Sequence, residues 1–157
     1  MLGQYEATKI GTEESWNVGF MSKDEIAFFW PQINEALEAQ PELWNSFYTK
    51  ESLIDGLVKE EFWLMAAAKN DTIHILTLCA VHSFPAGARL TSFWMYGEGL
   101  EEAAKLMDAF LENFAQAAGC SWIDGYGRKG YERMLKPYGY SFVRLHVARP
   151  VGIGARH

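Results

Sequence analysis

The sequence has few cysteines and no strongly basic stretch, and each of these shortages excludes a class of protein. Its two cysteines, Cys79 and Cys120, stand in separate apolar stretches without a motif partner. We therefore expect both to be reduced core residues rather than parts of a disulfide framework. The 14 Lys and Arg are outnumbered by 20 Asp and Glu, which gives a formal net charge of −6. Without a basic surface to contact phosphates, nucleic-acid binding is not expected.

Long apolar runs are missing as well. No run approaches the roughly 20 residues that a membrane-spanning helix needs. The first 14 residues lack the charged start and apolar centre of a signal peptide. We therefore expect a protein that does not insert into a membrane and that is located in the cytoplasm.

Residues for metal binding or nucleophilic catalysis are poorly placed. His74 and His82 stand eight positions apart in one predicted strand, which is about 26 Å when the strand is extended. That separation is too large for a single metal ion. No serine belongs to the strand–turn–helix motif of a nucleophile elbow. The sequence therefore predicts no metal site and no such nucleophile.

Apolar and aromatic residues, in contrast, are abundant. They include 6 Trp, 10 Phe and 7 Tyr, and 49% of the 157 residues are hydrophobic. A chain of this length can bury a full core as one domain. Because no repeat or linker interrupts the pattern, we expect a single domain over residues 1–157.

The clearest secondary-structure signal is one long amphipathic helix that begins at Leu100. Its apolar residues recur at three- and four-residue spacing, which is typical of a helix facing a core. They are Leu100, Ala103, Ala104, Met107, Leu111, Phe114, Ala115 and Ala118. Gly119 suits the left-handed position that ends many helices, and the turn Gly97-Glu98-Gly99 precedes the helix.

Shorter signals predict the remaining elements. Ser22 and Thr49 are candidate helix N-caps, and Pro31 suits the first turn of a helix. Period-two or continuous apolar patterns predict strands. These cover residues 62–68, 73–84, 89–96, 120–126 and a last strand from 140, with an edge strand at 5–10.

The order strand, acidic turn, long helix, strand, short helix, Gly-aromatic pair and strand resembles the C-terminal half of the GNAT (N-acetyltransferase) superfamily. More narrowly, the chain resembles compact GNAT-like proteins encoded by tailed phages. The resemblance covers residues 48–147. It is carried by Ala117-Ala118-Gly119-Cys120, Gly127-Arg128-Lys129-Gly130-Tyr131, Arg133-Met134-Leu135 and Gly139-Tyr140. It implies an α+β fold with a mixed, mostly antiparallel sheet of six or seven strands and helices on both faces.

The resemblance also implies where acetyl-CoA would bind. In the family, a loop before the long helix holds the pyrophosphate, because backbone N–H groups and the helix N-terminus favour anions. Gly97, Gly99 and Arg128 are the matching cofactor-binding candidates. This chain departs from the pattern, because its turn is short and no Arg or Gln stands at its start. Three carboxylates also lie there, each repelling a nearby phosphate by about 1 kcal/mol or more. They belong to Glu98, Glu101 and Glu102.

The family's general acid is missing from its usual position. The resemblance places a tyrosine four residues before the Gly-aromatic pair, but Leu135 occupies that position and cannot donate a proton. Tyr131 and Tyr138 are the candidate replacements, and Glu98 is the candidate base for an attacking amine.

Two functions therefore stay open. The first is a non-catalytic structural or interaction component without a cofactor, for which the phage resemblance implies a place in the virion. The alternative is an acyl-CoA-dependent N-acetyltransferase that acts on an amine and binds acetyl-CoA in an atypical way. The short acidic turn and the missing tyrosine favour the first.

A concentration of aromatic residues between 28 and 48 bears on the first function. Core packing explains such residues, but Trp and Tyr also dominate the energetics of interfaces. We expect this face to contact another protein, either a partner or a second copy of the chain. The residues are Phe28, Phe29, Trp30, Trp44, Phe47 and Tyr48.

Overall fold

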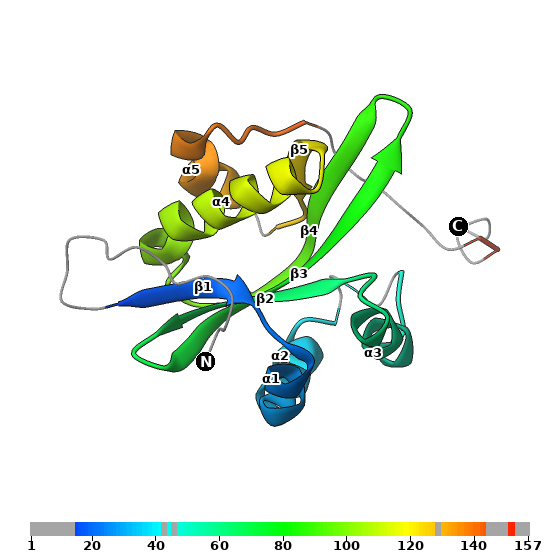
Figure 1. Ribbon diagram of the computed structural model, residues 1–157, viewed down its shortest axis with the longest axis vertical. Helices are drawn as coiled ribbons and strands as arrows, with labels where there is room; N and C mark the ends of the chain where they lie inside the picture. The colour runs from blue at the N-terminus through cyan, green and yellow to red at the C-terminus, as the bar shows by residue number, and fades with distance from the viewer. Residues whose placement is uncertain (1–14, 42–43, 45–46, 128–129, 144–150, 153–157) are drawn as a thin grey trace.

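In the computed structural model, a five-stranded sheet lies between two groups of helices (Figure 1). The structure describes residues 15–41, 44, 47–127, 130–143 and 151–152. The strands are β1 (Trp16–Phe20), β2 (Trp63–Lys69), β3 (Thr72–Phe84), β4 (Gly87–Gly97) and β5 (Cys120–Gly125). The helices are α1 (Lys23–Phe28), α2 (Trp30–Ala39), α3 (Lys50–Val58), α4 (Leu100–Ala117) and α5 (Tyr131–Leu135), followed by the 3₁₀ turn η2 (Lys136–Tyr138).

The helix starts and stops follow the local signals in the sequence. Ser22 accepts a hydrogen bond from the Glu25 N–H and Thr49 accepts one from Ser52, so each forms a capping box. Gly119 and Gly139 have φ angles of 73° and 87°. Each therefore supplies the left-handed residue that its turn requires.

The sheet has the order β1-β2-β3-β4-β5, and its strands are antiparallel except for the parallel pair β4–β5. Helices α1, α2 and α3 cover one face, and α4 with α5 covers the other (Figure 1). The predicted α+β class, the mostly antiparallel sheet and the helices on both faces are therefore confirmed.

The predicted number of strands, six or seven, is wrong for the described residues, which form five. Residues 140–143 are not in a strand, because their contacts are made with helices instead. The Phe142 N–H donates to Glu132 Oε1 on α5 at 3.3 Å, and the Tyr140 hydroxyl pairs with Asp108 on α4. The rest of the expected last strand (144–147) and the expected edge strand (5–10) lie outside the described residues.

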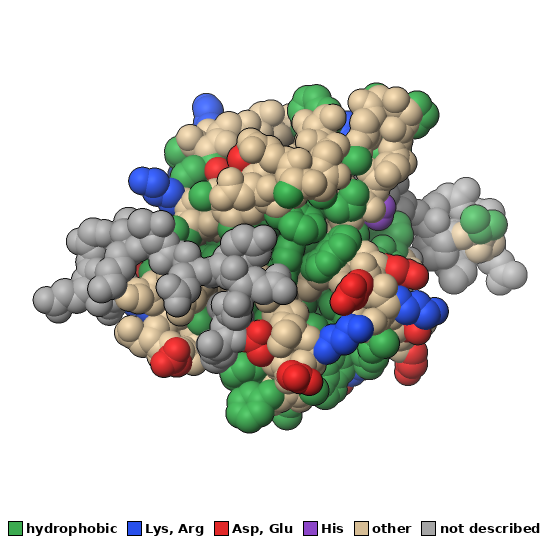
Figure 2. Space-filling model, in the orientation of Figure 1, with side chains coloured by type: hydrophobic (Ala, Val, Ile, Leu, Met, Phe, Trp, Pro, Cys, Tyr) green, Lys and Arg blue, Asp and Glu red, His purple; other side chains and the backbone are tan. Residues whose placement is uncertain are grey.

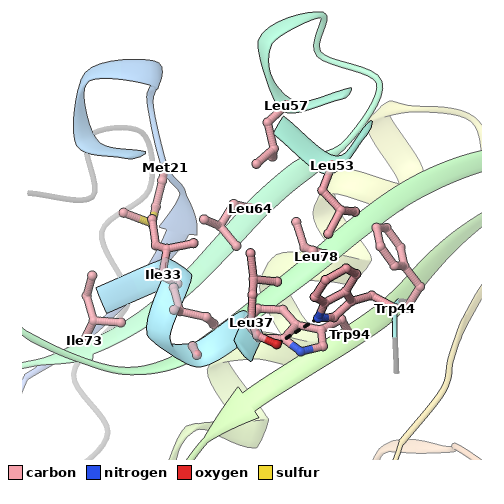
Figure 3. Packing of buried hydrophobic residues seen from close by; sticks show 14 of the residues in the cluster. Met21, Ile33, Leu37, Trp44, Leu53, Leu57, Leu64, Ile73, Leu78 and Trp94 are labelled. Carbon is pink, nitrogen blue, oxygen red and sulfur yellow. Dashed lines mark hydrogen bonds between the residues drawn. The ribbon is translucent and has the colours of Figure 1, made fainter. Parts of the chain in front are cut away.

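Two separate cores stabilise the sheet, one under each group of helices. Under α1–α3, Leu37, Leu53, Leu78 and Trp94 are almost fully buried in one cluster (Figure 3). Under α4, Ala103, Met107 and Phe110 pack against alternate residues of the same strands. Cys79 lies in this second core, where burial raises the pKa of its thiol to about 12. It is a core residue, as the sequence predicts.

Candidate active site at the parting of β4 and β5

The sheet opens where β5 leaves β4. The two strands pair in parallel from Ala88–Cys120 to Ser92–Gly125. On its other side β4 continues to pair with β3 as far as Gly97. Among the described residues, 93–97 therefore have a strand on one side only, and we call them the open stretch. Backbone N–H and C=O groups along such an edge can pair with an extended ligand.

A β-bulge marks the beginning of the open stretch. Trp94 lies opposite Leu78 and Ser92 lies opposite Cys79, so Phe93 is an extra residue in β4. A bulge bends and twists its strand, which helps two neighbours to separate. The last tie between the strands is the hydrogen bond from the Tyr126 N–H to the Ser92 carbonyl, at 3.0 Å.

Just before the parting, a network of side chains holds β5 to β4. Asp124 on β5 accepts a hydrogen bond from Thr91 Oγ1 at 2.6 Å and one from Arg89 Nη1 at 3.2 Å. Each of its two carboxylate oxygens therefore has a donor. The Arg89 guanidinium also lies 5.9 Å from the Phe84 ring and 5.4 Å from the Trp122 ring. No sequence-based prediction covered this network, although Arg89 and Asp124 carry opposite charges in two predicted strands.

Two cavities flank the region where β4 ends and α4 begins. One of about 420 Å³ lies on the α2 side, and one of about 600 Å³ lies between α4 and α5. The α2-side cavity is lined by Gln32, Glu35, Ala36, Ile73, His74, Leu76, Tyr96, Gly97 and Glu98. The α4–α5 cavity is lined by Glu101, Ala104, Gly130, Arg133, Met134 and Tyr138.

The three carboxylates that the sequence places at the start of α4 have different surroundings. Glu98 lines the α2-side cavity with Glu35, whereas Glu101 lines the α4–α5 cavity with Arg133. Glu102 pairs with Lys69 at 3.1 Å, and this partner lowers the pKa of its carboxyl. One of the three carboxylates, that of Glu101, therefore faces the cavity beside the first turn of α4.

The glycines of the turn have steric roles of their own. Gly97 has a φ angle of 131°, and a Cβ there would overlap the carbonyl oxygen of His74. Gly99 is the N-cap of α4 in the left-handed region, with φ 93°. Its carbonyl accepts hydrogen bonds from the N–H groups of Glu102 and Ala103. Leu100 and Glu101, the first two residues of α4, precede these donors, so the helix itself offers their N–H groups no acceptor. Helix starts with such N–H groups bind anions. Arg128, the third predicted cofactor residue, lies outside the described residues.

The two tyrosines predicted as proton donors differ in their surroundings. Tyr138 lines the α4–α5 cavity. Tyr131 packs against the core under α4. It lies so close to Gly127 that a Cβ on Gly127 would overlap the Tyr131 ring. Tyr138 is thus the better placed of the two to meet a ligand in that cavity.

Aromatic rings border the parting on the side of α1–α3. Tyr48, Phe62 and Phe93 lie with ring centroids 5.1 to 5.3 Å apart. Burial raises the pKa of the Tyr48 hydroxyl, and the neighbouring Tyr126 raises it further. The predicted aromatic surface over residues 28–48 is thus divided. Phe28 and Phe47 are exposed, while Tyr48 packs toward the sheet.

In the part of the chain that the structure describes, no helix is long and apolar enough to cross a bilayer. Over the same residues, no group of three His, Cys, Asp or Glu side chains is placed to hold a metal ion.

No protein-family model matches this sequence, and no curated protein sequence matches it either. Solved structures do. A predicted acetyltransferase from Clostridium acetobutylicum, crystallised with acetyl-CoA, is 16% identical, with a TM-score of 0.61 over 90% of this chain and 98% of that one.

Two further solved structures are similar to the same extent. An aminoglycoside acetyltransferase from an uncultured soil metagenomic sample, in complex with sisomicin, is 15% identical over 87% of this chain and 96% of that one, with a TM-score of 0.60. A GNAT family acetyltransferase from Staphylococcus aureus is 12% identical over 87% and 98%, with a TM-score of 0.56. Across nearly its whole length, this chain has the fold of the GNAT acetyltransferases.

Proposed function

We propose that this protein is an acyl-CoA-dependent N-acyltransferase whose open stretch of β4 holds the extended arm of the acyl donor. The observation that carries the proposal is the parting of β4 and β5 at the Phe93 bulge. It leaves a strand edge that ends at the first turn of α4. A similar fold crystallised with acetyl-CoA supports the same assignment.

The residues around this edge fit such a donor. The backbone of residues 93–97 can pair with an extended amide-containing chain. The N–H groups of Leu100 and Glu101 favour an anion at the helix start, and Arg133 lines the adjoining cavity. The Glu101 carboxylate repels a phosphate in this cavity. Arg133 lines the same cavity, so its positive charge counters that repulsion.

When bound, acetyl-CoA supplies an acyl group activated as a thioester. Tyr138 is the residue that we assign to donate a proton to the departing thiolate, since it lines the α4–α5 cavity. Glu98 lines the cavity on the opposite side of the sheet, where its role as a base stays a prediction.

We expect acetyl-CoA at a hundred times its dissociation constant to stabilise the protein by about 2.7 kcal/mol, which raises Tm by about 5–10 °C. Arg133→Ala should reduce this shift, whereas Lys136→Ala, in the neighbouring η2 turn, should not. Thermal denaturation with and without acetyl-CoA measures both effects. Release of free thiol in the presence of an amine measures turnover. An unchanged Tm together with no thiol release from a broad panel of amines would contradict the proposal.

A second candidate is a non-catalytic component that binds another protein, in a phage virion as the sequence resemblance implies. The observation that favours it is the exposure of two large aromatic side chains, Phe28 at 79% and Phe47 at 64%. Figure 2 shows hydrophobic side chains at the surface beside acidic residues over α1 and α2. Exposed aromatic residues of this size are common at protein interfaces.

This candidate predicts self-association or partner binding that depends on the exposed rings. Weak interfaces have dissociation constants on the order of tens of micromolar. Sedimentation of the wild type around that concentration should therefore show an apparent mass that rises with concentration. The double substitution Phe28→Ser and Phe47→Ser should abolish it. A wild type that is monomeric at every concentration, and that recovers no partner from cells or particles, would rule this function out.

A further inference from the structure

The parting of β4 and β5 has a second border, formed by tyrosine rings on the face that α1–α3 cover. We propose that Tyr48 and Tyr126 form the wall against which the acceptor lies, and that the acceptor is an amine carrying an aromatic or other flat apolar group. The inference rests on the proposed acyl transfer, because it assigns a substrate class to the same site.

Tyr126 stands at the point where the two strands separate. Its N–H donates to the Ser92 carbonyl at 3.0 Å, immediately before the extra residue Phe93. Successive strand residues alternate between faces. Leu90 and Ile123 pack in the core under α4, so their strand neighbours Thr91 and Asp124, which are hydrogen-bonded to each other, lie on the α1–α3 side. Tyr126 follows Asp124 by two positions and its backbone still pairs with β4, so its side chain lies on that side too. The side chain is 47% exposed, and a ligand can therefore reach it.

Tyr48 completes the wall from the helical layer. It immediately precedes Thr49, the N-cap that begins α3, so its backbone position is fixed by the helix start. Its ring lies 5.2 Å from that of Phe93 and 5.1 Å from that of Phe62. Phe93, against which the Tyr48 ring lies, directly follows Ser92, whose carbonyl accepts the hydrogen bond from the Tyr126 N–H. Rings from two distant segments thus meet at the bulge.

The charges near the wall indicate which ligand it favours. Asp124 is the adjacent carboxylate, and both of its oxygens already accept hydrogen bonds from Arg89 and Thr91. Glu35 and Glu98 line the α2-side cavity at the end of β4. Glu98 stands five positions beyond Phe93, which is about 17 Å along an extended chain. The wall therefore offers ring faces and hydroxyl groups rather than unpaired negative charge. Aromatic rings favour another ring in offset or edge-to-face packing, whereas a polycation would be drawn to the glutamates.

The test compares two amines, phenethylamine and spermidine, for binding and for turnover. Binding is measured by ligand-detected NMR without acyl donor, and turnover by thiol release from acetyl-CoA. In the wild type, phenethylamine should bind more tightly than spermidine. Tyr126→Ala should weaken its binding, and raise its KM, by about tenfold with little change in kcat. Phe28→Ala removes another exposed aromatic ring, on α1, and should change binding less than about twofold.

The outcomes separate this inference from the function on which it rests. Equal effects of Tyr126→Ala and Phe28→Ala, or a preference for spermidine, would overturn the aromatic wall even if acyl transfer occurs. Phenethylamine binding that is lost in Tyr126→Ala, without thiol release from acetyl-CoA and any amine, would support the wall and contradict the acyltransferase.

Discussion

Gly97→Ala should lower the free energy of unfolding by about 3 kcal/mol or more. Gly97 ends β4 with a φ angle of 131°, which L side chains rarely adopt. A Cβ there would also overlap the carbonyl oxygen of His74, the group that accepts a hydrogen bond from the Glu98 N–H. Backbone cannot move aside as a flexible side chain can, so the substitution would disrupt the end of the β3–β4 pair.

Gly119→Ala is the matched control for this prediction. Gly119 also has a positive φ, 73°, but no atom lies within 4 Å of the position that a Cβ would occupy. The left-handed conformation alone costs about 1–2 kcal/mol. Urea denaturation of the two variants, without any ligand, measures the difference. Similar losses in both would show that the contact with His74 is not what requires glycine.

The comparison bears on the role that the sequence resemblance gives Gly97. A glycine kept for phosphate binding should reveal its importance when acetyl-CoA is present. The geometry instead predicts that Gly97→Ala destabilises the protein even without acetyl-CoA, because the turn itself requires the glycine. The turn and a bound phosphate can both require glycine at position 97, since a backbone without a Cβ can approach another backbone or a ligand closely.

The parts of the fold that the sequence predicts are those with local signals. The stripe of apolar residues in α4, the caps at Ser22 and Thr49, and the stop at Gly119 each depend on residues within a few positions of one another. Helix capping and amphipathic spacing act over one or two turns. Such features could therefore be read without knowing which elements pack together.

The candidate site depends on contacts between distant segments, and so the sequence left most of it undetermined. The bulge at Phe93 is defined by its register against β3, and Arg89 meets Asp124 across two strands. A register shift has no local sequence signal in this chain, because both flanking segments are apolar. The same limit applies to Glu98 and Glu101. They are three positions apart, yet they line cavities on opposite faces of the sheet.

The aromatic residues between 28 and 48 show the limit of composition most clearly. The sequence predicts an aromatic binding face there, but it cannot separate rings that pack inward from rings that face water. The structure buries Trp44 to 7% exposure and leaves Phe47, three positions later, 64% exposed. Trp44 and Phe47 thus differ in burial although they belong to the same aromatic segment, and the core accepts the first of them.

Trp44→Ala should therefore lower the free energy of unfolding by about 3–5 kcal/mol, the usual cost of truncating a buried aromatic side chain. The indole packs in the same cluster as Leu37 and Trp94 (Figure 3). Its Nε1–H donates to the Leu37 carbonyl at 2.9 Å, and that hydrogen bond would be lost as well. Urea denaturation followed by near-ultraviolet circular dichroism measures the change.

Phe47→Ala is the control, because it removes an aromatic ring from the same segment at an exposed position. Its effect should stay within about 0.5 kcal/mol, as for most surface substitutions. If Trp44→Ala were as mild as Phe47→Ala, the indole would not be a core residue, and the packing under α2 would have to be revised. If the expected difference is found, any loss of self-association in Trp44→Ala reflects unfolding. Phe28 and Phe47 are then the positions at which an interface must be tested.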